Sequence, residues 1–306
     1  MSPLPATPQP SRFIGYALLF SGMALVGTYV ALSKPLTAVL PVFLLAWLRF
    51  GIAAVAMLPW TFRRGDEPPV GRREWATLFT QSFFGNFLFS IFMLTGVSMT
   101  SASAAGVILS TLPAVVALFS WIFLREHLAP RVWLAVALAV AGVATLTLAR
   151  GADAQSSSLT GNLLVFGCVC CEAVYVILGK RLTASLSAMR ISALINLFGL
   201  VLMTPLGLMQ ARAFDFAAPS AGTWWLLLFY SLAASMVSTW LWLSGLKHVP
   251  ANHSGVFTIA MPLAACVVGV AWLGERFGPA HAVAFGCAAA GIALIARPGR
   301  RLPSRL

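Results

Sequence analysis

Residues 124–130 read LREHLAP, and residues 273–279 read LGERFGP. Each stretch follows an apolar segment that contains a proline, Pro113 in the first case and Pro262 in the second. Both the motif and the proline recur at an offset of 149 residues. A chain that repeats itself at one fixed offset is predicted to consist of two structurally related halves.

The composition places these halves in a membrane. Hydrophobic residues make up 59% of the 306 residues and charged residues only 9%, which is too few to cover a water-facing surface. Their continuous apolar runs predict helices rather than the alternating strands of a barrel. Ten charge-poor stretches are each near the roughly 20 residues that a helix needs to cross the hydrocarbon core: 13–33, 37–62, 75–98, 101–124, 132–149, 159–179, 191–211, 221–246, 249–274 and 277–296.

The repeat extends through the other helices. The first stretch matches the sixth at an offset of 146, for example Tyr29 with Tyr175, and the third matches the eighth at 149. Each copy holds five stretches, an odd number, so the second copy must insert upside down, as in secondary transporters. We therefore predict an all-α polytopic membrane protein with ten transmembrane helices in two inverted five-helix repeats. The predicted parts are a disordered cytoplasmic N-terminus (1–12), the first repeat (13–149), a periplasmic linker (150–158), the second repeat (159–297) and a basic cytoplasmic tail (298–306).

The net charge of +12 reports topology rather than nucleic-acid binding. With the N-terminus inside, fifteen of the 20 Lys and Arg fall in internal loops and four in external ones, Lys34, Arg150, Arg212 and Arg276. The acidic loop residues split four to three, so the bias is specific to cations. It predicts a multi-pass protein of the bacterial inner membrane with both termini in the cytoplasm and an attraction to anionic lipid headgroups.

The motifs resemble those of the drug/metabolite transporter superfamily, in its ten-helix, EamA-type branch. Residues 124–130, 273–279, 46–50 and 173–175 carry the resemblance, which extends over roughly residues 14–297. It implies a secondary transporter that exports amino acids, other metabolites or toxic cations, with aromatic amino-acid exporters as the first comparison. Glu172 departs from the family pattern, in which an aromatic or small residue is usual, so the substrate does not follow from the resemblance.

Two charges lie inside predicted spans, Arg49 in the second and Glu172 in the sixth. A charge in hydrocarbon costs roughly 2.5–3.5 kcal/mol on insertion scales, so it faces a cavity or a partner. The two are predicted to lie within roughly 6 Å of each other in depth, at 1.5 Å per residue. Three interpretations stay open: the two residues form a structural ion pair, each meets one end of a zwitterionic substrate, or Glu172 carries protons.

Further residues are predicted to line a central substrate cavity. Tyr175 shares a helix face with Glu172, and its repeat mate Tyr29 lies in the first helix. Any single hydroxyl here is more often packing than ligand, but polar groups in lipid-buried helices gather toward the interior. Aromatic walls with a few polar points suit an apolar or aromatic solute with a charged end. The remaining candidates are Asn86, Ser90, Ser110, Ser235, Thr239, Trp242 and Thr258.

The duplicated prolines and glutamates have mechanical interpretations. Pro113 and Pro262 each remove a backbone hydrogen bond in mid-span, and with Gly106 and Gly255 they are candidate gating hinges. Ordinary helix packing is an equally good account of these four residues. Glu126 and Glu275 precede the fifth and tenth helices, where the helix dipole favours a carboxylate, so they are interpreted as structural.

No enzyme motif is present, and neither a cofactor nor a metal is predicted. The cluster of Cys168, Cys170 and Cys171 is interpreted as packing, because no histidine or second cysteine pair completes a zinc site. The predicted partner is a small-molecule substrate, moved by alternating access through the central cavity. The alternatives are a facilitative channel or pore for small solutes and an exporter of toxic amphiphilic cations. Saturable flux with trans-stimulation separates a carrier from a channel.

Overall fold

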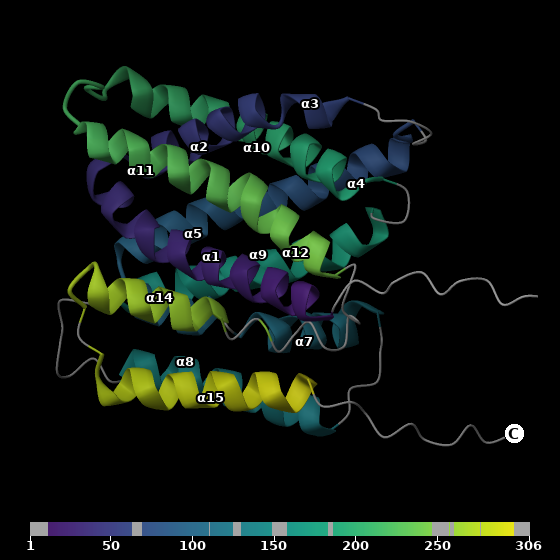
Figure 1. Cartoon of the computed structure of the whole chain (residues 1–306), viewed down its shortest axis with the longest axis vertical. Helices are drawn as coiled ribbons and strands as arrows, with labels where there is room; N and C mark the ends of the chain where they lie inside the picture. The colour runs from purple at the N-terminus through teal and green to yellow at the C-terminus, as the bar shows by residue number, and fades with distance from the viewer. Residues whose placement is uncertain are drawn as a thin grey trace, which may run out of the picture.

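The computed structural model of the chain describes residues 12–62, 69–109, 111–124, 130–148, 158–182, 186–246, 257, 260–275 and 277–296. Every regular element among them is a helix (Figure 1), as predicted. In chain order these are α1 (Arg12–Val39), α2 (Val42–Ala56), α3 (Leu58–Thr61), α4 (Arg72–Ser82), the π-helix η1 (Phe83–Leu88), α5 (Phe89–Ser98), α6 (Ala102–Leu109), α7 (Leu112–Leu124), α8 (Pro130–Leu148), α9 (Leu159–Leu182), α10 (Ala188–Arg212), α11 (Ala221–Leu232), the π-helix η3 (Ala233–Val237), α12 (Ser238–Leu246), α14 (Ala260–Ala271) and α15 (Pro279–Ala296).

Four helical segments of the described chain are long and apolar enough to cross a membrane, Ile14–Val39, Arg72–Ser98, Met189–Arg212 and Ala221–Trp242. Helices also lie in each of the other predicted stretches, but they are shorter or border residues outside the described ranges. The number of crossings therefore stays a prediction. Large apolar side chains on the outside of the bundle, such as Val55, Trp225 and Trp272, are 76%, 70% and 81% exposed, as lipid-facing residues are.

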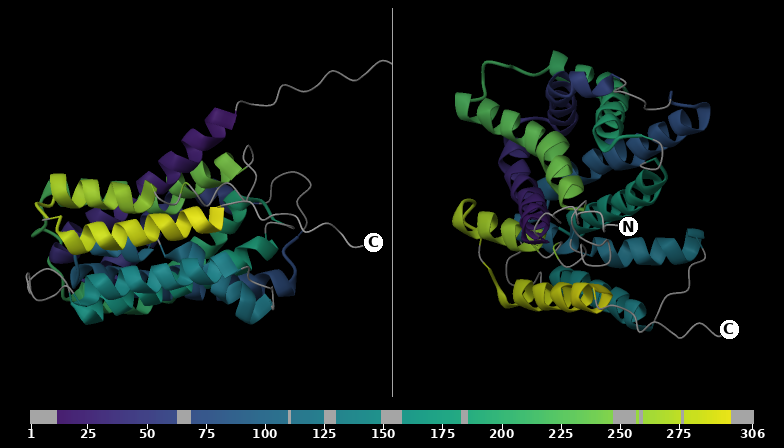
Figure 2. Two further views of the ribbon diagram at one scale, coloured as in Figure 1. Left: turned by 90° about the horizontal axis from the view of Figure 1, so that it is seen from below. Right: turned by 45° about the vertical axis from the view of Figure 1, so that its right-hand side comes forward.

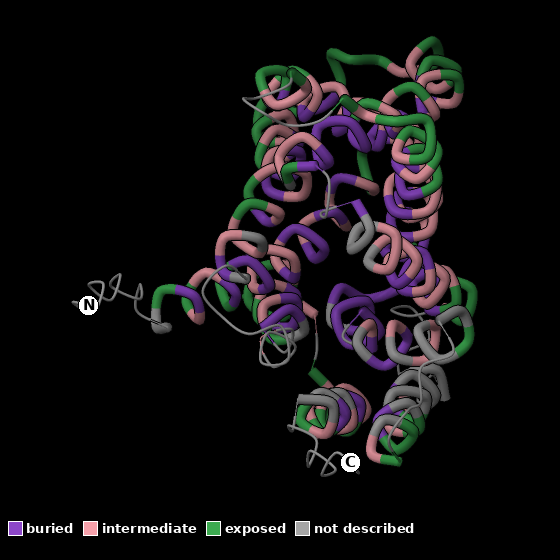
Figure 3. The backbone as a smooth tube through the Cα atoms, turned by 90° about the vertical axis from the view of Figure 1, so that its right-hand side faces the viewer, coloured by how far each residue is buried: buried purple, intermediate pink, exposed green. Residues whose placement is uncertain are grey.

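The helices form one bundle with α1 and α9 at its centre. α1 packs against α14, α12 and α5, and α9 packs against α5, α6 and α7. α2 and α10 pack on each other, and α8 and α15 form a pair at one edge of the molecule (Figures 1 and 2). Buried residues follow the inner sides of the helices, and exposed residues lie on the outside (Figure 3). The described start of α1 and end of α15 lie on the same side of the bundle.

Local sequence explains several helix boundaries. Ser187 and Ser220 cap α10 and α11, where their hydroxyls accept hydrogen bonds from Arg190 N at 3.4 Å and Thr223 N at 3.3 Å. The turn after α14 contains a left-handed residue, Gly274 at φ 67°, a conformation that glycine adopts without steric cost. The backbone N–H of Glu275 then donates to the Gly269 carbonyl at 2.9 Å, which closes the end of the helix.

The edge pair α8 and α15 makes reciprocal contacts. A Cβ on Gly142 would lie 3.3 Å from the Ala284 carbonyl oxygen, and one on Gly291 would lie 3.4 Å from the Ala135 carbonyl oxygen. Ala135 and Ala284 are related by the same offset of 149 residues as the two glycines. The two helices therefore run antiparallel and meet through equivalent residues, the relation that a two-fold axis between inverted halves produces.

A second pair of contacts repeats between the halves. A Cβ on Gly96 of α5 would lie 3.0 Å from the Gly161 carbonyl oxygen in α9, and one on Gly245 of α12 would lie 3.1 Å from the Gly15 carbonyl oxygen in α1. These glycines are repeat mates, so the close crossing of α5 with α9 recurs between α12 and α1. In both cases the absence of a side chain lets two backbones touch.

The fourth predicted span contains two described helical segments, which lie on either side of residue 110, a position outside the described residues. These are α6 and α7, and Pro113 is the second residue of α7. Pro113 has no N–H to donate to the carbonyl four residues earlier. Just before it, Thr111 N donates to the Ile108 carbonyl at 3.0 Å, three residues back, which is a tighter turn than that of an α-helix. Gly106 is buried in α6, and Pro262 is the third residue of α14. Gly255 lies outside the described residues, so the hinge role of this set stays a prediction.

Two π-helical segments, η1 and η3, were not predicted from the sequence. They interrupt the third and eighth spans at positions related by the repeat, Phe83–Leu88 and Ala233–Val237. π-Segments are rare and are frequent at functional sites, because the extra residue per turn shifts side chains and frees backbone groups. Their recurrence marks the middle of these two spans.

Candidate substrate site

Arg49 lies in the middle of α2 with only 6% of its surface exposed. Its Nη2 donates a hydrogen bond to Ser90 Oγ of α5 at 2.8 Å. Its Nε is buried and has no hydrogen-bond partner, and no carboxylate of the described chain pairs with the guanidinium. The guanidinium also lies over the Phe50 ring, with Cζ 4.3 Å from the ring centroid, so the buried cation meets a hydroxyl and aromatic faces but no opposite charge among the described residues.

Two tyrosines of the bundle core lie beside this guanidinium. The Arg49 Cζ atom is 6.0 Å from the ring centroid of Tyr230 in α11. Tyr230 in turn meets Tyr29 of α1 edge to face, with ring centroids 5.8 Å apart. Neither tyrosine hydroxyl forms a hydrogen bond with any described residue, although a buried phenol normally finds a partner. The cluster thus holds hydroxyls that bond to no residue of the described ranges.

Glu172 supplies the opposite charge from α9. Glu172 is half-buried in the bundle. It lies close enough to Tyr29, Tyr175 and Cys168 to influence these side chains electrostatically. Its carboxylate accepts no hydrogen bond and forms no ion pair within the described residues. Glu172 and Tyr175 both lie on α9, three residues apart, and their shared role at a substrate cavity stays a prediction.

The structural ion pair between Arg49 and Glu172, one of the three interpretations of the sequence, is not formed. Arg49 is directed to Ser90 and Tyr230, whereas Glu172 lies on α9 with Tyr175. Both residues are nevertheless within electrostatic range of Tyr29. The two charges therefore face one region of the bundle without neutralising each other.

Tyr175 is held by the first π-helix. Its ring lies directly on the backbone of Gly85, at a distance that leaves no room for a Cβ there. Its backbone carbonyl accepts a hydrogen bond from Gln81 Nε2 at 3.2 Å. Asn86 Nδ2 donates to the Ile195 carbonyl of α10 at 2.7 Å, so the predicted site residue Asn86 joins η1 to α10.

The remaining candidates contribute less. Ser90 is the hydrogen-bond partner of Arg49, as described. Ser235, Thr239 and Trp242 lie on η3 and α12, are partly accessible, and form no hydrogen bond with the described residues. No described contact joins them to Arg49 or Glu172. Ser110 and Thr258 lie outside the residues that the structure describes.

Tyr230 was not among the residues predicted from the sequence, whereas the polar residue Gln81 of the third span was expected near the cavity. The two are repeat mates at an offset of 149, and each contacts the repeat-related tyrosine of its own neighbourhood, Tyr29 or Tyr175. The repeat could have identified Tyr230, because the position in one half that matches a site residue of the other half is itself a candidate site residue. The difference in residue type between Gln81 and Tyr230 hid the relation.

The arrangement can bind a solute that carries both charges. The buried guanidinium suits a carboxylate, and the accessible carboxylate of Glu172 suits an ammonium group. Tyrosine rings between them offer apolar contact and free hydroxyls. Among the described residues, no group of three or more His, Cys, Asp and Glu is placed to hold a metal ion, and the five cysteines are free thiols.

The chain matches the EamA-like transporter family over residues 13–148 and again over residues 159–297. It belongs to this family. It is therefore a multi-pass membrane transporter, as the resemblance of its motifs implied.

Similar proteins agree with this assignment. The chain is 35% identical to the uncharacterized transporter YetK of Bacillus subtilis (strain 168) over 281 residues, which cover 90% of this chain and 85% of YetK. It is 31% identical to the threonine/homoserine exporter RhtA of Escherichia coli (strain K12) over 179 residues, 57% of this chain and 55% of RhtA. A protein of known crystal structure shares the fold, with a TM-score of 0.64 at 21% identity over 93% of this chain and 98% of that one.

Proposed function

We propose that this EamA-family transporter is a secondary exporter of amino acids, or of similar zwitterionic metabolites, in the bacterial inner membrane. The observation that carries the proposal is the pair of unneutralised opposite charges, Arg49 and Glu172, in one region of the bundle. Arg49 would bind the carboxylate of the solute and Glu172 its ammonium group. The similarity to RhtA supports the same substrate class.

Aromatic and other apolar amino acids are the favoured substrates within this class. Tyr29 and Tyr230 present rings beside Arg49, and the core around them is almost entirely apolar. An apolar side chain that leaves water for this environment gains roughly 0.8 kcal/mol per CH₂ group. Small polar amino acids would gain less from the same site.

Transport would proceed by alternating access around this site. The reciprocal contacts of α8 with α15, and the twofold match of the family to residues 13–148 and 159–297, support two inverted halves. Inverted halves allow one set of contacts to open toward each side in turn, around a site near the membrane midplane. The internal bias of cations supports cytoplasmic termini. Glu172, the one carboxylate in a predicted span, would bind a coupling proton if transport is proton-coupled.

Solute analogues test the proposal directly. Purified protein is reconstituted in proteoliposomes, and counterflow of radiolabelled phenylalanine, leucine and threonine is measured against empty vesicles. Competition by the N-acetylated acid, which lacks the ammonium group, and by the decarboxylated amine, which lacks the carboxylate, probes the two poles separately. The intact amino acid should compete at least tenfold better than either analogue, since a charge-assisted hydrogen bond contributes roughly 1.5–3 kcal/mol.

The alternatives predict other outcomes. If the amine competes as well as the amino acid, the protein is an exporter of amphiphilic cations. Flux that neither saturates nor accelerates with solute on the opposite side identifies a channel. No flux of any zwitterion above empty vesicles, with protein shown to be folded, contradicts the proposal.

A further inference from the structure

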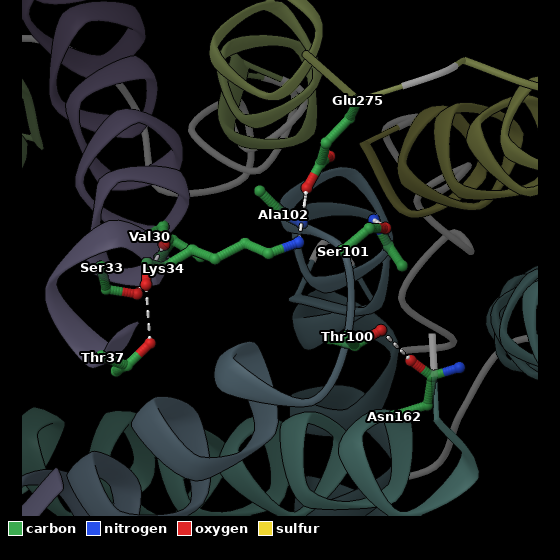
Figure 4. A network of polar contacts seen from close by, with 10 residues as sticks. Val30, Ser33, Lys34, Thr37, Thr100, Ser101, Ala102, Asn162 and Glu275 are labelled. Atoms are coloured by element: carbon green, nitrogen blue, oxygen red, sulfur yellow. Dashed lines mark hydrogen bonds and ion pairs between the residues drawn. The ribbon is translucent and has the colours of Figure 1, made fainter. Parts of the chain in front are cut away.

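Glu275 joins the two halves of the molecule at one face of the bundle. Its Oε1 atom is 3.1 Å from Nζ of Lys34 in α1 and accepts a hydrogen bond from the backbone N–H of Ala102 at 2.7 Å (Figure 4). Ala102 is the first residue of α6. The sequence interpretation of Glu275 as structural considered only the helix that follows it; in the structure the carboxylate caps a helix of the other half, 173 residues away.

Both the backbone and the side chain of Glu275 are held by hydrogen bonds. Gly274 turns the chain at the end of α14, and the Glu275 backbone N–H closes that helix on the Gly269 carbonyl. The side chain of the same residue opens α6. One residue thus fastens the end of α14 to the start of α6, and these two helices belong to the proline-containing spans that the repeat relates.

Further bonds at this face join the halves beside Glu275. Thr100 Oγ1 donates to Asn162 Oδ1 of α9 at 2.7 Å, and Ser158 N donates to the Met99 carbonyl at 2.9 Å. Lys34 and Glu275 are the charged members of this set, with side chains 33% and 10% exposed. Water reaches them only partly, so the charge-assisted bonds are strong and screened little.

We propose that Glu275 is a latch that holds this face of the transporter closed. The start of α6 cannot part from α1 and the end of α14 here unless the carboxylate leaves Lys34 and the Ala102 N–H. Opening of this face toward the substrate site therefore breaks both bonds. The latch rests on the proposed alternating-access function, but it names residues that do not touch the solute.

Cys168 serves as a reporter of opening. It is fully buried in α9 and lies within electrostatic range of Glu172 and Tyr29. In a protein that keeps Cys168 and has serine at the other four cysteines, a charged, membrane-impermeant thiol reagent reaches it from the Lys34 face only when that face opens. Labelling rates are measured in spheroplasts and in inside-out vesicles, with SDS-denatured protein as the full-labelling reference. An Arg212→Cys protein without native cysteines identifies the preparation that exposes this face, since the charge bias of the loops predicts that Lys34 and Arg212, the last residue of α10, are both external.

Three variants weaken the proposed latch to different extents. Lys34→Met removes the ion pair and keeps the helix cap, Glu275→Gln keeps a neutral acceptor for Ala102, and Glu275→Ala removes both bonds. Labelling from the Lys34 face should rise about tenfold in Lys34→Met and in Glu275→Gln, the factor that corresponds to about 1.4 kcal/mol, and further in Glu275→Ala. Arg212→Met, which removes an exposed cation of the same face, should leave labelling unchanged.

The outcomes separate the latch from the proposed function. Labelling needs no substrate, so a rise in the graded order supports the latch even if no amino acid is transported. Equal labelling in wild type, Lys34→Met and Glu275→Gln, including no labelling in any of them, overturns the latch while leaving amino-acid transport standing. If Glu275→Ala fails to fold, Lys34→Met decides, because its helix cap is intact.

Discussion

Tyr29 in α1 and Tyr175 in α9 occupy equivalent positions of the two halves, but their neighbours differ in chemistry. Tyr29 meets the ring of Tyr230, whereas the backbone carbonyl of Tyr175 accepts a hydrogen bond from Gln81, the repeat mate of Tyr230. The same pair of positions is in contact in both halves. The duplicated chain has thus kept the geometry of the contact and changed what it offers a solute.

The charges show the same difference more sharply. Arg49 is related by the offset of 146 residues to Ile195, and Glu172 to Val26. One half therefore contributes the cation and the other the carboxylate, and neither is duplicated. A symmetric frame lets the two faces open in turn, while an asymmetric pair of charges lets a zwitterion bind in one orientation. The following predictions test whether frame and charges are separable in this way.

The largest expected effect is that of Arg49→Met. Uptake of carboxylate-bearing amino acids should fall roughly ten- to a hundredfold, because a hydrogen bond to a charged group contributes about 1.5–3 kcal/mol. Uptake of the corresponding decarboxylated amine should change little. Initial rates are compared at equal reconstituted amounts, with Arg49→Lys as the control that keeps the charge. A parallel loss for acid and amine would mean that Arg49 only supports the fold.

Glu172→Gln should fold and insert normally and yet change transport several-fold. Glutamine keeps the shape of the side chain but removes the titratable group and the charge that would meet an ammonium. We expect an altered pH dependence of transport or a weaker preference for amine-bearing solutes. The measurement is the initial uptake rate against pH for several solutes, with wild type at the same protein amount. Superimposable profiles would leave Glu172 with a structural role only.

Valine at either crossing glycine tests the frame. Gly96→Val and Gly245→Val should each lower stability by roughly 1–3 kcal/mol, the usual cost of overpacking, because a Cβ at either position meets the backbone of the partner helix. The melting temperature in detergent is the readout. Gly286→Ala is the matched control, since a Cβ there meets nothing within 4 Å. Tolerance of one valine and not of the other would show that the two crossings are not equivalent.

The smallest expected effect concerns the other face. The repeat mates of Lys34 and Glu275 are Lys180 and Glu126, and Glu126 lies outside the described residues. If Lys180 and Glu126 form an equivalent latch at the opposite face, Lys180→Met should favour opening of that face. Labelling of Cys168 from the Lys34 face should then fall by a few-fold, whereas Lys34→Met should raise it. The same sole-cysteine assay measures both. A change of the same sign in the two variants would count against alternation between the faces.

Much of the architecture was predictable from local patterns. Continuous apolar runs gave the all-helical membrane fold, which the structure confirms, and the paired LREHLAP and LGERFGP motifs gave the family, which the comparison confirms. The prediction that Arg49 and Glu172 face a cavity or a partner followed from the cost of charge in hydrocarbon. Their failure to pair was not predictable, because depth along two helices does not reveal how the helices face each other across the bundle.

Sequence by itself determined which segments are helical and which residues are too polar to face lipid, because both depend on hydrophobicity within a single segment. Only the tertiary structure decided where the long-range bonds lie. Glu275 caps α6 of the other half because packing brings α14 and α6 together at one face. Likewise, the π-turn of η1 and the close fit of Gly85 to Tyr175 occur where helices of both halves pack on each other. A contact between segments so far apart in the chain cannot be predicted from a local sequence pattern.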